Sequence, residues 1–213
     1  MATDATSQPL PPIGDEGSLN ALLNRRRSSR RFTSRPLSPQ DLGAIAWAAQ
    51  GVRGAGNRVI PSAHALYGLT LTAIVGNVDG DTLPAGIYTY KPETHTLVAV
   101  VDGDHREAVA RTTLADRDWL GKAAVMFLLS GDLGAATHHF KEQPPPGLRG
   151  QRYLWIEAGH VSQNVYLAAT EAGLGAVLVA GFDDDQLLGL TPAVVPAGTH
   201  PLALLALGHP NSD

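Results

Sequence analysis

Residues 153–185, YLWIEAGHVSQNVYLAATEAGLGAVLVAGFDDD, predict one long helix, a glycine break and a buried strand. Apolar or small side chains recur at helical spacing in the first part, at Leu154, Ala158, Val161, Val165, Ala168 and Ala172. Gly173 and Gly175 end the helix, because glycine tolerates the left-handed conformation of a C-cap. The apolar run 176–180 predicts a strand covered on both faces, and Gly181 ends it. We expect this helix to form the core on which the chain packs and half of a dimer interface.

The composition is that of a globular chain with a substantial core. Its 213 residues are 44% hydrophobic and 17% charged, with a formal net charge of −4. This balance gives no global attraction for nucleic acid, and the absence of cysteine excludes disulfides, thiolate metal sites and a cysteine nucleophile. No apolar run approaches the roughly 20 residues that span a bilayer, and no signal-peptide pattern is evident. The histidines lack metal-ligand spacing. We therefore expect a cytoplasmic protein that engages no nucleic acid, membrane or metal.

Strands and helices alternate irregularly along the chain, which predicts a mixed α and β fold. Residues 1–17 are rich in Pro, Ser, Thr and Asp and predict a disordered arm, whereas residues 18–213 predict a single domain. Residues 137–150 are expected to form a loop or lid. Strands are expected at 69–75, 87–90, 96–101, 123–130 and 202–207, and further helices at 19–24, from Pro39 to Gly51, at 106–114 and at 183–190.

An arginine run near the start is the sharpest chemical signal. Six arginines lie between Arg25 and Arg35 in a chain that is acidic overall. The guanidinium group presents a planar fork that matches phosphate, and the Ser28 hydroxyl adds a donor. The alternative is a solvated basic segment that binds nucleic acid, although only Phe32 supplies an aromatic ring nearby.

Two glycine- or serine-containing turns are further candidates. Pro61-Ser62-Ala63-His64 exposes backbone N–H groups and a hydroxyl without bulk, which suits the edge of a flat ring. Gly181 follows a buried strand, where a ligand can approach backbone amides closely. Read alone, each is also consistent with an ordinary turn.

Taken in order, these segments resemble the nitroreductase superfamily, and within it the SagB-type dehydrogenase branch. The matching segments are RRSSRRF (26–32), LSPQDL (37–42), AAQG (48–51), RVIPSAHALY (58–67), PAGIYTY (84–90), EAGHVSQN (157–164), GLGA (173–176) and GFDD (181–184). The resemblance implies an α+β, nitroreductase-like fold with a central, mostly antiparallel sheet flanked by helices. It also implies a long buried helix at a homodimer interface, where FMN binds.

The resemblance assigns site residues by motif position. Arg26 and Ser28 would hold the FMN phosphate, and Arg30 would reach the phosphate or the pyrimidine edge of the ring. The turn would line the ring from the partner subunit, and the Gly181 amide would face flavin N5 and O4. The full cofactor-binding set is Arg26, Arg27, Ser28, Arg30, Pro61, Ser62, Ala63, His64, Asn164, Ala180 and Gly181.

The implied function is that of an FMN-dependent oxidoreductase. Hydride would pass between NADH or NADPH and a small organic acceptor through flavin N5, with no catalytic side chain required. One alternative is a SagB-type dehydrogenase acting on an azoline-containing or otherwise modified peptide or heterocycle. Another is a flavin-binding subunit without turnover.

Three positions depart from the family pattern. His64 stands where the family usually has glycine, so a side chain there narrows the pocket or contacts the flavin. Residues 143–150, QPPPGLRG, lack the Lys-Tyr pair of members that oxidise azolines. The segment after the last strand, HPNSD at 209–213, lacks the basic phosphate ligands of many nitroreductases.

Overall fold

The computed structural model describes residues 18–80 and 83–211, and it contains one six-stranded sheet. The strand order is β3-β2-β1-β4-β6-β5, and every neighbouring pair is antiparallel. The expected arm, residues 1–17, lies outside the described residues. The expected strands are all present, as β1 (Leu69–Val75), β2 (Gly86–Lys91), β3 (Thr96–Asp102), β4 (Val125–Gly131), β5 (Gly175–Val179) and β6 (His200–Gly208).

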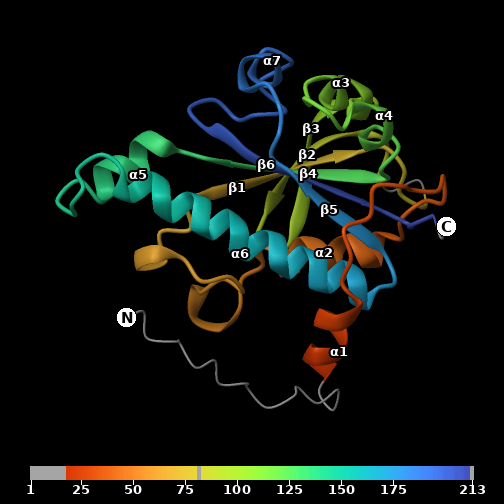
Figure 1. Ribbon diagram of the computed structural model, residues 1–213, viewed down its shortest axis with the longest axis horizontal. Coiled ribbons are helices and arrows are strands. Elements are labelled where there is room, and N and C mark those ends of the chain that lie inside the picture. Colours follow the sequence, from red (N-terminus) through yellow and green to blue (C-terminus); the bar gives the residue numbers. More distant parts are fainter. Residues whose placement is uncertain (1–17, 81–82, 212–213) are drawn as a thin grey trace, which may run out of the picture.

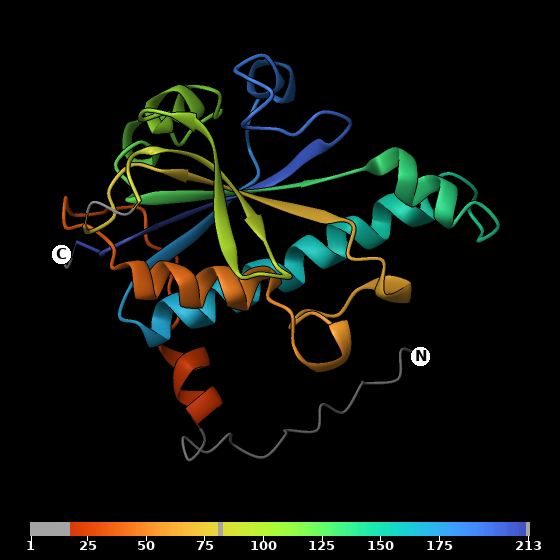
Figure 2. The ribbon, with the colours of Figure 1, turned by 180° about the vertical axis from the view of Figure 1, so that it is seen from behind.

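Helices cover both faces of the sheet. Their bounds are α1 (Ser18–Arg25), α2 (Pro39–Gln50), α3 (Arg106–Arg111), α4 (Arg117–Leu120), α5 (Leu133–His139), α6 (Arg149–Glu171) and α7 (Asp184–Leu188). Helices α2 and α6 lie side by side on one face, and α3, α4 and α7 lie on the other (Figures 1 and 2). The α+β class and the antiparallel sheet are therefore confirmed.

Helix α2 begins as the sequence predicts. Ser38 has an extended backbone and its Oγ accepts a 3.0 Å hydrogen bond from the Asp41 amide. Pro39 occupies the first helical turn, where its missing N–H leaves no hydrogen bond unmade. Leu42, Ile45 and Ala49 then face the sheet and are fully buried. The cap and the apolar spacing together place this helix.

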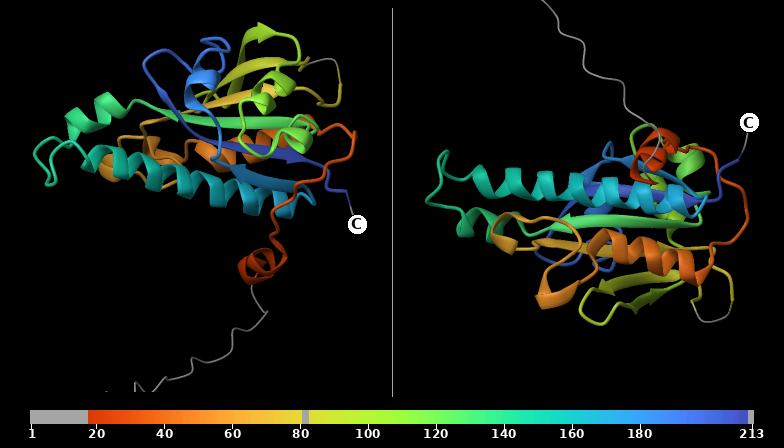
Figure 3. Two further views of the ribbon diagram at one scale, coloured as in Figure 1. Left: turned by 45° about the horizontal axis from the view of Figure 1, so that its top comes forward. Right: turned by 90° about the horizontal axis from the view of Figure 1, so that it is seen from below.

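The long helix α6 runs across the sheet beside α2 (Figure 3) and buries one stripe of its surface. The stripe comprises Leu154, Ala158, Val161, Val165 and Ala169. The opposite face is open in the single chain, where Trp155 and Ile156 are 51% and 49% exposed. Gly173, at φ +70°, ends the helix with the left-handed cap that the sequence predicts.

Helix α6 starts at Arg149, four residues before the predicted start at Tyr153. Its first turn packs against α5, because a Cβ at Gly150 would lie 2.2 Å from the Ala136 carbonyl oxygen. Helix α5 lies partly in the stretch that the sequence predicts as a loop.

No helix in the described ranges is long and apolar enough to cross a membrane.

The segment that contains the arginine run crosses one end of the sheet. Ser28 forms a parallel bridge with Ala176 of β5, and Phe32 bridges Pro210 beyond β6. Leu37 then bridges Val78, which follows β1. The segment therefore passes from the β5 edge of the sheet to its centre.

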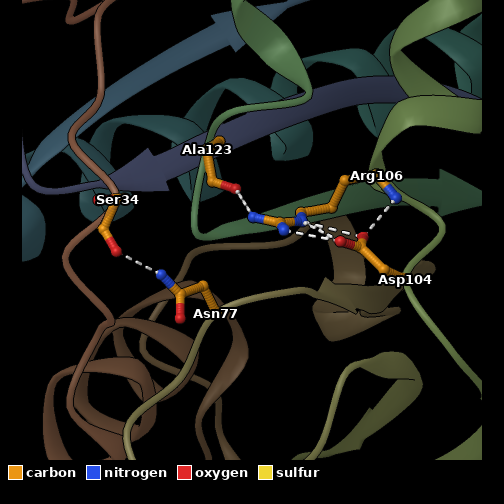
Figure 4. Close-up of polar contacts among 5 residues, drawn as sticks. All are labelled: Ser34, Asn77, Asp104, Arg106 and Ala123. Carbon is orange, nitrogen blue, oxygen red and sulfur yellow. Dashed lines mark hydrogen bonds and ion pairs between the residues drawn. The ribbon is translucent and has the colours of Figure 1, made fainter.

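Hydrogen bonds from the Asn77 and Arg106 side chains hold together the segments at this end of the sheet (Figure 4). Asn77 donates a 2.7 Å hydrogen bond to the Ser34 carbonyl. Arg106 donates to the Ala123 carbonyl at 2.6 Å and holds the Asp104 carboxylate with its other nitrogens. The Arg106 guanidinium lies so close to Gly76 that a Cβ there would be 1.7 Å from Nε. Arg106 therefore joins α3 to the ends of β1 and β4.

Candidate functional site

Tyr166 of α6 contacts the outer edge of β5. Its hydroxyl accepts a 2.8 Å hydrogen bond from the Leu178 amide and lies 3.3 Å from Ser28 Oγ. The guanidinium carbon of Arg26 lies 5.2 Å from the centre of the Tyr166 ring. Two of the predicted phosphate ligands, Arg26 and Ser28, are thus brought together against the edge strand by a residue that the sequence reasoning did not assign to the site.

The other two basic candidates are placed differently. Arg27 donates hydrogen bonds to the carbonyls of Asn24, at 2.6 Å, and Arg26, at 2.9 Å. These contacts direct the Arg27 side chain to the end of α1, where a cation complements the helix dipole. Arg30 is exposed. In this chain the Arg27 guanidinium is therefore engaged by backbone, whereas Arg26 and Ser28 face the edge of β5.

Gly181 lies beyond the opposite end of β5. Its carbonyl accepts a 2.9 Å hydrogen bond from the Leu114 amide, whereas its own amide donates to no described residue. A Cβ added to Gly181 would meet no atom within 4 Å, and the neighbouring Ala180 is exposed. The backbone at Gly181 is therefore open to close approach by a ligand.

The edge of β5 thus presents two kinds of binding group. Arg26 and Ser28 supply charged and hydroxyl donors near Ala176, and Gly181 lies five residues farther along, at most about 17 Å away. Guanidinium and hydroxyl donors suit an anion, and an open glycine amide suits the edge of a flat ring. These residues fit a ligand that carries an anion at one end and a planar ring at the other.

The Pro61–His64 turn packs on the first half of α6. Ser62 Oγ accepts a 2.9 Å hydrogen bond from the Tyr67 amide and donates one of 2.5 Å to Glu157 Oε2. His160 Nδ1 lies 3.3 Å from the Pro61 carbonyl. Ser62 is therefore an anchor of the turn, and its hydroxyl is already engaged on both sides.

Glu157 is a buried acid beneath this turn. It is 3% exposed, and its Oε1 has no hydrogen-bond partner among the described residues. Burial raises the pKa of Glu157, because water no longer stabilises the carboxylate, and the Ser62 hydrogen bond and the Arg58 charge oppose that shift. The carboxylate is thus held in an unfavourable environment by the contacts of the turn.

His64 projects from the turn toward α5. Its Nδ1 lies 3.2 Å from His139 Nε2, and its ring centre lies 4.9 Å from that of Phe140. Ala63 precedes it in the short 3₁₀ turn Ala63–Ala65. The His64 side chain therefore links the turn to the neighbouring helix.

In a single chain the turn and the arginine segment lie at different points along α6. Glu157, which holds the turn, and Tyr166, which contacts Arg26, are nine residues apart, or about 13 Å along the helix axis. The contribution of the turn to the site of a second subunit remains a prediction.

Asn164, on α6, contacts the neighbouring helix α2. Its Nδ2 donates a 3.1 Å hydrogen bond to the Ala48 carbonyl, which ties α6 to α2. This contact gives Asn164 a packing role in the single chain.

Tyr166 and Glu157 had recognisable signals in the sequence. Tyr166 is a long side chain with a polar tip in an apolar helix, and a partly buried tyrosine hydroxyl usually finds a partner. Glu157 falls beside the buried stripe, between Leu154 and Ala158, where an unpaired acid is rare. Neither signal reveals which distant residue is the partner.

Comparisons with known proteins agree with this fold. The nitroreductase family model matches residues 23–209. The protein named nitroreductase MJ1384 of Methanocaldococcus jannaschii is 34% identical over 200 residues, covering 93% of this chain and 94% of the relative.

Two solved structures share the fold. The microcin synthetase McbBCD complex of E. coli, bound to truncated pro-MccB17, has a TM-score of 0.71 at 21% identity, covering 99% of this chain and 79% of the matched chain. A nitroreductase from Desulfovibrio desulfuricans in complex with FMN has a TM-score of 0.62 at 21% identity, covering 92% of this chain and 88% of the other. With the family match over most of its length, the chain belongs to the nitroreductase family of oxidoreductases.

Proposed function

We propose that the chain is an FMN-dependent oxidoreductase that exchanges a hydride between NADH or NADPH and a small organic acceptor. The observation that carries the proposal is the edge of β5, where Arg26 and Ser28 meet at Tyr166 and the same strand leads to the open amide of Gly181. The FMN complex of the Desulfovibrio nitroreductase supports the choice of ligand. When bound, FMN would supply the two-electron chemistry at N5.

The residues of this chain would bind and orient the cofactor. Arg26 and Ser28 would hold the phosphate. The Arg26 guanidinium would do so through charge-assisted hydrogen bonds. Arg30 is free to turn toward the phosphate or the pyrimidine edge. The Gly181 amide would donate to the N5 and O4 edge, with Ala180 beside it. A donor at that edge stabilises the charge that develops during hydride transfer.

The proposal includes a homodimer. The exposed Trp155 and Ile156 leave one face of α6 uncovered, and a second copy packed on that face would bury it. The Pro61–Ala63 turn of the second subunit would then cover the flavin ring, completing a pocket of which β5 forms one wall. Ser62 would act there through its anchored backbone, since its hydroxyl is engaged by Tyr67 and Glu157.

A modified peptide is the second candidate substrate. The likeness of fold to the peptide-bound McbBCD complex favours it. In this chain the stretch where azoline oxidases carry a Lys-Tyr pair is rich in proline, from Pro144 to Pro146. A small acceptor is therefore the leading proposal, and oxidation of an azoline-containing peptide is the alternative.

An absorbance spectrum combined with turnover assays tests the proposal. The purified full chain is expected to show flavin bands, or to retain added FMN through gel filtration, and to oxidise NADH or NADPH with a quinone or nitroarene. A protein that stays colourless after FMN is added contradicts the proposal. Retained flavin without turnover supports a binding subunit, and turnover only with an azoline-containing peptide supports the alternative substrate.

A further inference from the structure

His64 adopts a backbone conformation that favours glycine. Its φ and ψ are 54° and 22°, in the left-handed region where a Cβ crowds the following carbonyl. Ala65 and Tyr67 also have positive φ, of 51° and 49°. Strained backbone of this kind gathers at functional sites, where neighbouring contacts hold it in place. This unfavourable backbone conformation therefore indicates that the His64 side chain has a role beyond forming the turn.

The His64 side chain belongs to an imidazole pair on an aromatic floor. Its ring centre lies 5.4 Å from that of His139 at an angle of 72°, and Nδ1 to Nε2 is 3.2 Å. The ring of Phe140, itself 2% exposed, packs against both imidazoles and against Tyr153. Both histidines are exposed. Phe140 thus supports both imidazole rings, and both rings remain accessible to solvent.

The hydrogen bond between His64 and His139 limits the number of protons that the two rings can hold together. One nitrogen must carry the hydrogen and the other must offer a lone pair, so the two rings cannot both be cationic without losing the contact. His64 Nε2 remains directed away from the shared bond. A pair of imidazoles in which one ring orients the other is suited to proton transfer.

We propose that His64 donates a proton to the acceptor in the proposed oxidoreductase reaction, and that His139 is a positioning residue that orients its ring. The inference rests on the proposed function, in which the turn that carries His64 covers the flavin. Reduction of a quinone consumes one hydride and one proton. Reduced FMN, when bound, would supply the hydride, and the His64 imidazolium would supply the proton. The hydroquinone leaves, and the neutral imidazole regains a proton from water.

Other charged or titratable groups surround the turn and enter any pH dependence. Helix α6 contributes Glu157 and His160, and its Tyr153 reaches the floor beneath the pair. Arg58 and Tyr67 lie on the loop that carries the turn. None of them is hydrogen-bonded to His64 among the described residues, so His139 is the group that sets its orientation.

Replacement of His64 by glycine tests the donor role without opposing the backbone, since glycine accepts a φ of 54°. Anaerobic stopped-flow measurements on the FMN-loaded protein follow flavin reduction by the nicotinamide donor and reoxidation by a quinone separately, for wild type and for His64→Gly. Reoxidation by a quinone should slow by about 100-fold, the scale of general acid catalysis, and lose its fall at high pH. Added imidazole should restore part of the rate. His138→Ala, a neighbouring histidine on α5, is the matched control and should behave as wild type.

A readout that needs no cofactor is the NMR titration of the histidines in the full chain. We expect His139→Asn to shift the titration of His64, and His64→Gly to shift that of His139. Independent titration, or a His64→Gly reoxidation rate and pH profile equal to wild type, overturns the inference and leaves the proposed function standing. Failure to bind FMN overturns both.

Discussion

The Ser62 hydroxyl donates a 2.5 Å hydrogen bond to the carboxylate of Glu157, 95 residues away in sequence, and thereby anchors the Pro61–His64 turn to α6. The same hydroxyl accepts from the Tyr67 amide. One serine therefore ties the turn both to Tyr67 and to α6, and the Glu157 carboxylate that accepts its hydrogen bond is buried.

The burial of Glu157 makes the free energy of unfolding depend on pH. Because burial raises the pKa of Glu157, the folded chain keeps the proton at pH values where the unfolded chain has released it. The resulting stability is fully present below the unfolded pKa and is lost as pH rises through the folded pKa. Glutamine cannot ionise, so the stability of Glu157→Gln relative to wild type should increase with pH. Urea unfolding at about pH 4 and about pH 8 measures this, and parallel pH profiles would contradict it.

Tyr166→Phe removes the hydroxyl that joins Ser28 to the Leu178 amide and keeps the ring beneath Arg26. We expect a loss of about 1 kcal/mol in unfolding free energy and faster hydrogen exchange at Leu178. FMN binding should weaken as Ser28 loses its support. Tyr153→Phe, which removes a hydroxyl bonded to Gln143, is the control and should leave FMN affinity unchanged.

Gly181→Ala separates folding from cofactor binding. The added Cβ meets no atom within 4 Å in the chain, so the free energy of unfolding should stay within about 0.5 kcal/mol of wild type. The same methyl group would occupy the approach to the amide and should weaken FMN binding. Thermal unfolding without FMN and fluorescence titration with FMN measure the two effects. Unchanged affinity would remove Gly181 from the site.

Asn164→Ala should lower the stability of the fold and leave FMN affinity unchanged, the opposite of Gly181→Ala. Loss of the hydrogen bond to the Ala48 carbonyl should lower the free energy of unfolding by about 1 kcal/mol, because that contact ties α6 to α2. FMN affinity, measured on the folded variant, should match wild type. A clear loss of affinity at equal folded fraction would instead support the expected place of Asn164 in the cofactor-binding set.

The regular elements could be predicted because their signals are local. Alternation and apolar runs mark the strands, with residues 69–75 matching β1, and Ser38 with Pro39 marks the start of α2. Helix α5 was missed because its seven residues include Gly134 and two histidines, with only Asp132 as a cap. The start of α6 was missed because Leu148 offers no side-chain cap, and packing of Gly150 on α5 places it.

The site was predicted as a set of segments rather than as contacts. Motif order identified the arginine segment, the turn and Gly181, but no local pattern pairs Tyr166 with Leu178 or Ser62 with Glu157. Those pairings depend on how α6 lies against β5 and the turn. The same limit applies to Arg27, whose engagement at the end of α1 follows from the local backbone path.

The most direct test of the account compares the dissociation constants of FMN and riboflavin, which lacks the phosphate, for wild type and Arg26→Ala. We expect wild type to prefer FMN, and Arg26→Ala to lose about 1.5–3 kcal/mol of FMN binding, or about 10- to 150-fold, with little change for riboflavin. Equal affinity of wild type for the two ligands, or an Arg26→Ala variant that keeps the full preference for FMN, would contradict the placement of the phosphate at the β5 edge.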